Sequence, residues 1–274
     1  MNITAKSKIC MVIGDPVGHS LSPAIFNAGF EKLGIDDQFV YVGSTVKPEQ
    51  LEDFMKGVRV MNIRGISCTI PHKLEIIKYL DEVDEVAQKI GAANTIVNED
   101  GVLKGYNSDW MGAVGPLERY LDLKGKKIAL LGAGGAARAI AFGVNQKGAE
   151  LVIFNRTKEK SGKIASEFGG RTSDKLDGIQ TVDIIINATS VGMVPDVNES
   201  PINKDLITSK QIVFDVVYNP FETQLLRDAK EKGAKIIHGS EMFLAQAAFQ
   251  FKLFTGLDAP EEVMRNALLT ELKK

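Results

Sequence analysis

A glycine-rich turn between an apolar run and an alanine-rich run constrains this chain more than any other feature. The run Ile128-Ala129-Leu130-Leu131 is typical of a buried strand, and Gly132-Ala133-Gly134-Gly135-Ala136 follows it directly and opens a helical stretch to Lys147. Gly132 can adopt the positive φ of a tight turn, and the next two glycines place no Cβ between the backbone and a bound group. The N-terminus of a helix favours an anion. The pattern therefore predicts a turn that binds the pyrophosphate of a dinucleotide.

The residues after the next predicted strand indicate which dinucleotide binds. Leu151–Phe154 is followed by Asn155-Arg156-Thr157, with Lys160 close behind. NAD-binding units commonly place an acidic residue here, on the ribose 2′-hydroxyl, and this chain has none. The guanidinium of Arg156 matches a phosphate, and Lys160 adds a second positive charge. The loop favours NADP, and the alternative is that both cations belong to an ordinary solvated loop.

Composition excludes several other classes of protein. The 274 residues are 44% hydrophobic and 25% charged with a net charge of −2, typical of a globular protein without a nucleic-acid partner. No apolar stretch is long enough to cross a membrane, and the first residues lack the core of a signal peptide. Two cysteines and three histidines form no pattern typical of a disulfide framework or a zinc site. We expect a cytoplasmic, metal-free protein with a small-molecule substrate, either a monomer or a homodimer.

Two α/β domains are predicted from the order of the apolar runs. Strand-like and helix-like runs alternate between residues 126 and 238, which indicates a parallel sheet covered by helices on both faces. Residues 1–109 alternate less regularly and include a predicted hairpin at 94–104. We expect an N-terminal substrate domain with a mainly parallel sheet over residues 1–109, completed by helices in 241–274 that return to it. A Rossmann-type domain is expected over 110–240.

Polar residues follow the first strand of the N-terminal domain. Ser20 and Ser22 lie between that strand and a predicted helix, and Pro23 comes next. A serine before a proline is typical of a helix N-cap, which by itself explains Ser22. The alternative is that the two hydroxyls bind a small anion at the start of the helix.

Other polar residues lie at similar positions further along. Lys73 falls in the first turn of a helix predicted over 71–80, where the dipole disfavours a cation, so it indicates either an anionic partner or a solvated lysine. Cys68 is expected in the core. Asp109 is either a helix cap or a functional carboxylate. Gln246 and Gln250 lie one turn apart in an apolar helix, so we expect at least one of them to face a polar ligand.

Taken together, the motifs of this chain resemble those of the shikimate dehydrogenase family, in order and over essentially its whole length. The motifs are GDPVGHSLSP (14–23), SCTIPHK (67–73), GAANT (91–95), GYNSDWMG (105–112), GAGGAARA (132–139), NRT (155–157), NATSVG (187–192), DVVYNP (215–220) and EMFLAQAA (241–248).

The resemblance implies an NADPH-dependent, reversible reduction of 3-dehydroshikimate to shikimate, on the route to chorismate and aromatic amino acids. It implies that Lys73 is the acid and base and that Asp109 orients it. The residues implied to bind substrate also include Ser20, Ser22, Thr69, Asn94, Tyr218 and Gln246. Those implied to bind the cofactor are Gly132, Ala133, Gly134, Gly135, Ala136, Asn155, Arg156, Thr157, Lys160, Thr189, Ser190, Gly239 and Met242.

The chain departs from the common pattern of the family in three places. Ser67-Cys68 replaces the more frequent Asn-Val, Ser108 replaces Thr, and Lys160 replaces Arg. Two alternatives to the implied function stay open: a quinate/shikimate dehydrogenase with relaxed cofactor use, and a non-catalytic module that senses shikimate. The presence of both Lys73 and Asp109 speaks against the second.

Overall fold

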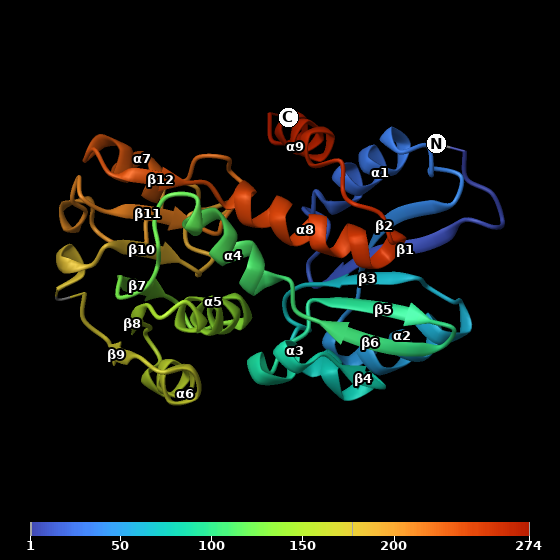
Figure 1. Cartoon of the computed structure of the whole chain (residues 1–274), viewed down its shortest axis with the longest axis horizontal. Helices are drawn as coiled ribbons and strands as arrows, with labels where there is room; N and C mark the ends of the chain where they lie inside the picture. Colours follow the sequence, from blue (N-terminus) through green and yellow to red (C-terminus); the bar gives the residue numbers. More distant parts are fainter. Residues whose placement is uncertain (1, 177, 274) are drawn as a thin grey trace. The chain divides into compact units, whose positions relative to one another are not determined.

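The computed structural model describes residues 2–176 and 178–273 and divides into two compact units (Figure 1). Unit 1 consists of Met1–Ser108 with Gln246–Lys274, and unit 2 consists of Asp109–Ala245. In the described part of the chain, no helix has the length and apolar character needed to cross a membrane.

Unit 1 is built on a mixed six-stranded sheet in the order β2-β1-β3-β5-β6-β4. Its strands are β1 (Lys8–Gly14), β2 (Phe39–Thr45), β3 (Gly65–Cys68), β4 (Glu82–Val83), β5 (Thr95–Glu99) and β6 (Val102–Tyr106). β1 pairs in parallel with β2 and β3, and β4 pairs in parallel with β6. β5 is antiparallel to both β3 and β6, as the predicted hairpin requires. The ends of β1, β3 and β6 and the start of β5 therefore lie along one edge of the sheet.

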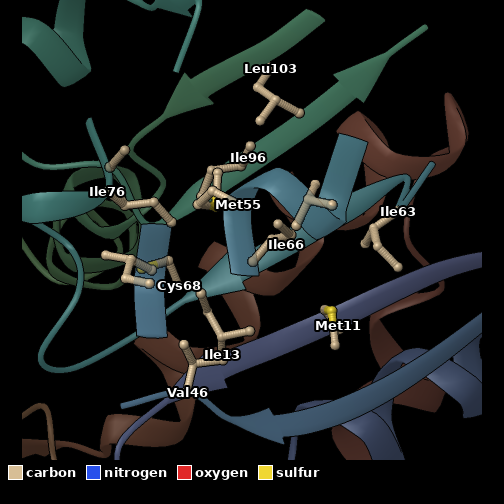
Figure 2. Packing of buried hydrophobic residues seen from close by; sticks show 13 residues of the cluster. Met11, Ile13, Val46, Met55, Ile63, Ile66, Cys68, Ile76, Ile96 and Leu103 are labelled. Carbon is tan, nitrogen blue, oxygen red and sulfur yellow. The ribbon is translucent and has the colours of Figure 1, made fainter. Parts of the chain in front are cut away.

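Helices cover both faces of this sheet. On one face α2 (Leu51–Val60) packs Met55 and Val58 into an apolar cluster with residues of β1, β3, β5 and β6 (Figure 2). Cys68 is one of the buried members of this cluster, which confirms it as a core residue.

The opposite face of the sheet is aromatic. It involves α1 (Ser22–Lys32), the second half of α8 (Gly239–Thr255) and α9 (Glu261–Glu271), which packs against α1 (Figure 1). Phe26 of α1 stacks on Tyr41 of β2, with ring centroids 4.2 Å apart, and Phe251 of α8 lies 6.0 Å from Phe26. A Cβ on Gly65 would lie 2.4 Å from the Phe254 ring, so this glycine permits the close approach of α8 to β3. The C-terminal helices therefore return to unit 1, as predicted.

Two local predictions in unit 1 are wrong. Residues 71–74 form turns instead of the first part of a helix, and only a 3₁₀ helix, η2 (Glu75–Tyr79), follows. The carbonyl of Lys73 accepts from Ala93 N at 2.9 Å instead of from a later residue of its own segment, so the argument from a helix dipole at Lys73 does not apply. Helix α1 already includes Ser22, and the preceding Leu21 makes no side-chain cap bond, so Ser22 is not an N-cap.

The shorter elements of unit 1 fall close to their predicted places. A 3₁₀ turn, η1 (Pro48–Gln50), precedes α2, and α3 (Glu85–Ile90) ends at Gly91 in the left-handed region with φ 70°. Asp84 caps α3 by accepting from Val86 N at 2.9 Å.

Unit 2 contains a six-stranded parallel sheet in the order β12-β11-β10-β7-β8-β9. Its strands are β7 (Lys127–Leu131), β8 (Glu150–Phe154), β9 (Arg171–Ser173), β10 (Ile184–Asn187), β11 (Ile212–Asp215) and β12 (Lys235–Ile237). Its helical elements are α4 (Asp109–Glu118), α5 (Gly135–Gln146), α6 (Lys158–Phe168), α7 (Gln224–Glu231), the first part of α8, and the short 3₁₀ turns η3 (Ile179–Thr181) and η4 (Lys204–Leu206). The strand order reverses between β7 and β10, which is the Rossmann arrangement predicted from the sequence, and such a reversal is where ligands bind in parallel sheets.

Candidate functional site

In unit 1, the loops that follow β1 and β3 lie against each other. Asp15 N donates to the carbonyl of Ile70 at 3.0 Å, and Thr69 N donates to Ile13 O at 2.9 Å. A Cβ on Gly14 would lie 2.5 Å from Thr69 Cγ2, so the absence of a side chain there allows this contact. The sheet edge thus brings Thr69 next to the loop that carries Ser20 and Ser22.

The two serines of the first loop are hydrogen-bonded to each other. Ser20 Oγ donates to Ser22 Oγ at 3.3 Å, and Ser22 N donates to Ser20 Oγ at 3.4 Å. Ser22 is buried and Ser20 half-buried. Because Ser22 does not cap α1, its hydroxyl is one of two held together at the N-terminus of this helix, an arrangement suited to a small anion.

Lys73 is held close to β5 through its backbone. The bond from Ala93 N to Lys73 O joins the turn after β3 to the residue that precedes Asn94. Its side chain is half-buried, and the neighbouring His72 is buried with its Nε2 2.6 Å from Val46 O. Lys73, Thr69 and Asn94 are therefore gathered along the same sheet edge.

Asn94 is fixed by Ser108, the last residue of unit 1 before α4. Ser108 N donates to Asn94 Oδ1 at 2.8 Å, and Asn94 Nδ2 donates to Ser108 Oγ at 2.9 Å. Because a backbone N–H can only donate, these bonds settle which end of the Asn94 amide is the acceptor. Ser108 Oγ also lies 3.4 Å from Gln246 Oε1, and Asp109, the next residue, is buried at the start of α4.

A chain of buried polar side chains runs beneath these residues. Tyr41 Oη donates to Ser67 Oγ at 2.5 Å, and Ser67 Oγ donates to Gln250 Oε1 at 2.6 Å. Gln250 Nε2 donates in turn to Thr95 Oγ1 at 3.0 Å. Burial raises the pKa of the Tyr41 phenol, which keeps it protonated and able to donate.

In unit 2, the glycine turn has the predicted conformation. Gly132 has φ +109°, and a Cβ there would lie 3.0 Å from the carbonyl oxygen of Ala188. Gly134 precedes α5 without a side-chain cap, and its missing side chain faces open space. No acidic residue lies in the first turn of this helix. The uncapped N–H groups and this open approach fit a pyrophosphate.

Two cations that are not neutralised follow β8, Arg156 in the loop and Lys160 in the first turn of α6. Arg156 and Lys160 are exposed, and neither has an ion-pair partner within residues 2–176 and 178–273. Their neighbour Lys158, in contrast, pairs with Asp174 at 2.8 Å. Asn155 Nδ2 donates to Thr157 O at 2.9 Å, so the residue that replaces the acid of NAD-binding units holds the loop in shape. This donor set fits a phosphate.

A buried carboxylate joins the ends of β10 and β11. Asp215 accepts from Asn187 Nδ2 at 2.9 Å, from Val217 N at 3.0 Å and from Thr223 Oγ1 at 2.6 Å. Burial raises its pKa to about 6 although these three bonds act in the opposite direction. Asn187 Oδ1 accepts from both the amide and the hydroxyl of Thr189, at 3.0 and 2.7 Å. The carboxylate thereby orders the segment with Thr189 and Ser190, at the reversal point of the sheet.

The remaining predicted residues lie where β11 and β12 lead into α8. The Tyr218 ring stacks on Phe243, with centroids 4.5 Å apart, and burial raises the pKa of its phenol to about 12. A Cβ on Gly239 would lie 2.4 Å from Val217 O, so only glycine allows α8 to begin this close to the 215–218 segment. Met242 is buried in the first turn of α8.

Comparison with known proteins covers nearly the whole chain. Residues 12–96 match the sequence profile described as shikimate dehydrogenase substrate binding domain, 117–217 match shikimate / quinate 5-dehydrogenase, and 239–269 match shikimate 5'-dehydrogenase C-terminal domain. A relative from Methanocaldococcus jannaschii, named shikimate dehydrogenase (NADP(+)), is 44% identical over 99% of this chain and 100% of its own length. The chain belongs to the shikimate dehydrogenase family.

Solved structures of the shikimate dehydrogenase family agree with this fold. A crystal structure of shikimate dehydrogenase in complex with NADP+ has a TM-score of 0.93 and 43% identity, covering 99% of this chain and 98% of its own. The enzyme from Thermus thermophilus, in complex with NADP(H) and shikimate, has a TM-score of 0.89 and 37% identity, covering 96% and 99%.

Sequence reasoning missed several residues that support the site of this family member. Tyr41, Asn187, Asp215 and Thr223 were not singled out, and Ser67 was noted only as a departure from the family pattern. All five are buried. Tyr41, Ser67, Asn187 and Asp215 carry a polar group in a strand that is otherwise mainly apolar, and Thr223 is the N-cap of α7, so a polar residue in such a strand or a threonine before a helix is the signal that could have found them. Gln250 was expected to need partners, and it has them within unit 1.

Proposed function

We propose that this chain catalyses the reversible NADPH-dependent reduction of 3-dehydroshikimate to shikimate. The observation that carries the proposal is its identity of 44% over 99% of its length to a relative named shikimate dehydrogenase (NADP(+)). The gathering of hydroxyl, amide and ammonium groups along one edge of the unit 1 sheet supports it. A polyhydroxylated carboxylic acid needs such groups.

Substrate recognition is assigned to the edge of the unit 1 sheet. The hydroxyls of Ser20 and Ser22 are suited to the substrate carboxylate, because they lie together at the N-terminus of α1. The ring hydroxyls would be bound by Thr69, Asn94 and Gln246, and Tyr218 would contact the carboxylate.

Lys73 would serve as the acid in reduction and as the base in the reverse direction. When bound, NADPH supplies the hydride that reduces the ketone. Negative charge then grows on the ketone oxygen, and the ammonium of Lys73 would stabilise that charge and give the oxygen a proton. The carboxylate of Asp109 would favour the charged form of Lys73 and orient it.

The cofactor would be held by unit 2. Gly132, Ala133, Gly134, Gly135 and Ala136 provide the turn for the pyrophosphate, where the uncapped start of α5 fits an anion. The 2′-phosphate would be bound by Asn155, Arg156, Thr157 and Lys160. The nicotinamide would lie against Thr189, Ser190, Gly239 and Met242.

We further propose that residues 1–109, completed by 241–274, act as the substrate domain and residues 110–240 as the cofactor domain. The partners would be small molecules, with the protein acting as a monomer or homodimer. A cytoplasmic location is consistent with Cys10 and Cys68, which are buried free thiols.

A four-way assay tests the proposal. Shikimate or quinate is supplied with NADP or NAD, and the reduced nicotinamide is followed by absorbance. Fast turnover with shikimate and NADP alone is the expected result. Comparable rates with quinate or NAD would indicate a quinate/shikimate dehydrogenase with relaxed cofactor use. Binding of shikimate without turnover in any combination would contradict the proposal and favour a sensing module.

A further inference from the structure

We propose that Gln250 is a positioning residue of the substrate site, which orients Ser67 and Asn94 from within α8. The inference rests on the proposed function, because it takes Asn94 to be a substrate ligand. It adds a residue outside the set implied by the resemblance to the family, together with Thr95 as the relay between the two amides.

The carbonyl oxygen of the Gln250 amide fixes Ser67. The buried phenol of Tyr41 donates to Ser67 Oγ at 2.5 Å, so this hydroxyl must send its own proton elsewhere. It donates to Gln250 Oε1 at 2.6 Å. Ser67 can then meet any further group only as an acceptor, because its single proton is committed.

The nitrogen of the Gln250 amide holds Asn94 from a second side, in addition to Ser108. Gln250 Nε2 lies 3.3 Å from the backbone carbonyl of Asn94, which can only accept, so the nitrogen end of the amide must face it. The same nitrogen donates to Thr95 Oγ1 at 3.0 Å, and Thr95 Oγ1 donates to Asn94 Oδ1 at 2.8 Å. The direction of every bond is therefore set from Tyr41 to Asn94. The amide nitrogen of Asn94 is its donor end, and it gives one of its two protons to Ser108 Oγ.

Filling space does not explain an amide at this position. Gln250 is 1% exposed and lies in an otherwise apolar stretch of α8, where an apolar residue of similar length would fill the same volume. Burying an amide is costly unless it is hydrogen-bonded, and both the oxygen and the nitrogen of the Gln250 amide bond to polar residues at the sheet edge. The arrangement links the two sides of the edge, β3 and β5, through one side chain.

The first test replaces the amide without changing its length. Gln250→Met should raise the KM for shikimate about tenfold, the factor expected when one hydrogen bond to a ligand is lost or misdirected, with the KM for NADP unchanged. Gln211 is a matched control, because it is also 1% exposed and donates to Ile179 O at 2.7 Å in unit 2. Gln211→Met should lower the melting temperature comparably and leave the KM for shikimate unchanged.

A second variant keeps the proposal testable if Gln250→Met does not fold. Thr95→Val has the same shape and removes only the hydroxyl that relays Gln250 to Asn94. It should raise the KM for shikimate, and Thr95→Ser, which restores the hydroxyl, should return the KM to the wild-type value.

An exchange of positions tests the pairing of Gln250 with Ser67. Ser67→Asn alone adds volume beside a full-length Gln250 and should raise the KM for shikimate, as should Gln250→Ala alone. The double variant has an amide on β3 and none at position 250 of α8. Its fold-increase in the KM for shikimate should therefore be smaller than the product of the fold-increases of the two single variants.

The proposal would be overturned if Gln250→Met changed the KM for shikimate and the KM for NADP equally. It would also be overturned if Gln250→Met lowered stability and left the KM for shikimate unchanged. A wrong assignment of function would be distinguished from a wrong role for Gln250, because the wild-type protein would then show no turnover with shikimate and NADP.

Discussion

The two units gather polar groups at one edge of a sheet in different ways. In unit 1 the groups, apart from the ammonium of Lys73, are hydroxyls and amides fixed mainly by other side chains, as in the chain from Tyr41 through Ser67 and Gln250 to Thr95. In unit 2 the turn is shaped by backbone, with Gly132 at φ +109°, and the nearby buried Asp215 carries a titratable group. A site made by backbone depends on one or two glycines, whereas a site made by side chains depends on every member of a network.

This difference determines what a substitution does in each unit. A change within the unit 1 network should alter recognition of the substrate, because it redirects donors and acceptors. A change at a unit 2 glycine should alter the path of the chain and thereby the binding of the cofactor.

The largest effect is expected at Lys73. Lys73→Met should lower kcat by a factor on the order of 10² to 10⁴, with little change in KM, because the lost proton transfer and charge stabilisation act mainly in the transition state. Lys78→Met is the control, because Lys78 is exposed and paired with Glu75 in η2. Steady-state kinetics across pH measures both. A variant that kept most of kcat and an unchanged pH profile would show that Lys73 is not the acid.

The next largest effect concerns the buried carboxylate of unit 2. The pKa of Asp215 is raised from 3.8 to about 6, so between these values the folded state binds more protons than the unfolded state. Its contribution to stability is therefore present at low pH and is lost as pH rises through about 6, a total of about 3 kcal/mol. Asp215→Asn should remove this pH dependence.

Urea unfolding of the wild type and Asp215→Asn between pH 4 and 8 measures the difference. Asp205→Asn is the control of opposite sign, because Lys232 lowers the pKa of that exposed carboxyl. Parallel pH curves for the wild type and Asp215→Asn would contradict the raised pKa.

The two glycines of the cofactor turn should separate backbone shape from access to the phosphate. Gly132→Ala should lower stability by about 2 kcal/mol, through the cost of a positive φ and a Cβ 3.0 Å from Ala188 O, and should also weaken NADP binding. Gly134→Ala places its Cβ in open space, so it should leave stability unchanged and weaken NADP binding alone. Thermal unfolding and NADPH titration measure the two effects. Equal loss of stability in both variants would refute this separation.

The smallest effect is expected at the exposed cations of unit 2. Arg156→Gln should raise the KM for NADP about tenfold and leave the KM for NAD unchanged, because only NADP has the 2′-phosphate. Lys158→Gln serves as the control, because Lys158, at the start of α6 two residues after Arg156, is also exposed but is paired with Asp174. A similar rise in both KM values after Arg156→Gln would indicate a role in the shape of the loop.

Local sequence patterns were sufficient to predict structure where the residue types involved have few structural roles. The glycine turn at 132–136, the five strands predicted in unit 2 and the return of the C-terminal helices to unit 1 were all predicted. The prediction failed at residues 71–74, because the carbonyl of Lys73 bonds to Ala93 across the sheet edge, a partner twenty residues away. It also failed at Ser22, where a local cap motif was outweighed by an earlier start of α1.

The sequence by itself determined the class of fold, the cofactor turn and the family, because these depend on periodicity, on glycine and on motifs read in order. Only the tertiary structure decided how the polar residues are oriented. The direction of the hydrogen bonds between Tyr41 and Asn94 depends on β2, β3, β5 and α8 meeting in space, and the raised pKa of Asp215 depends on its burial. Both are consequences of long-range packing, in which residues far apart in the chain exclude water from one another's polar groups.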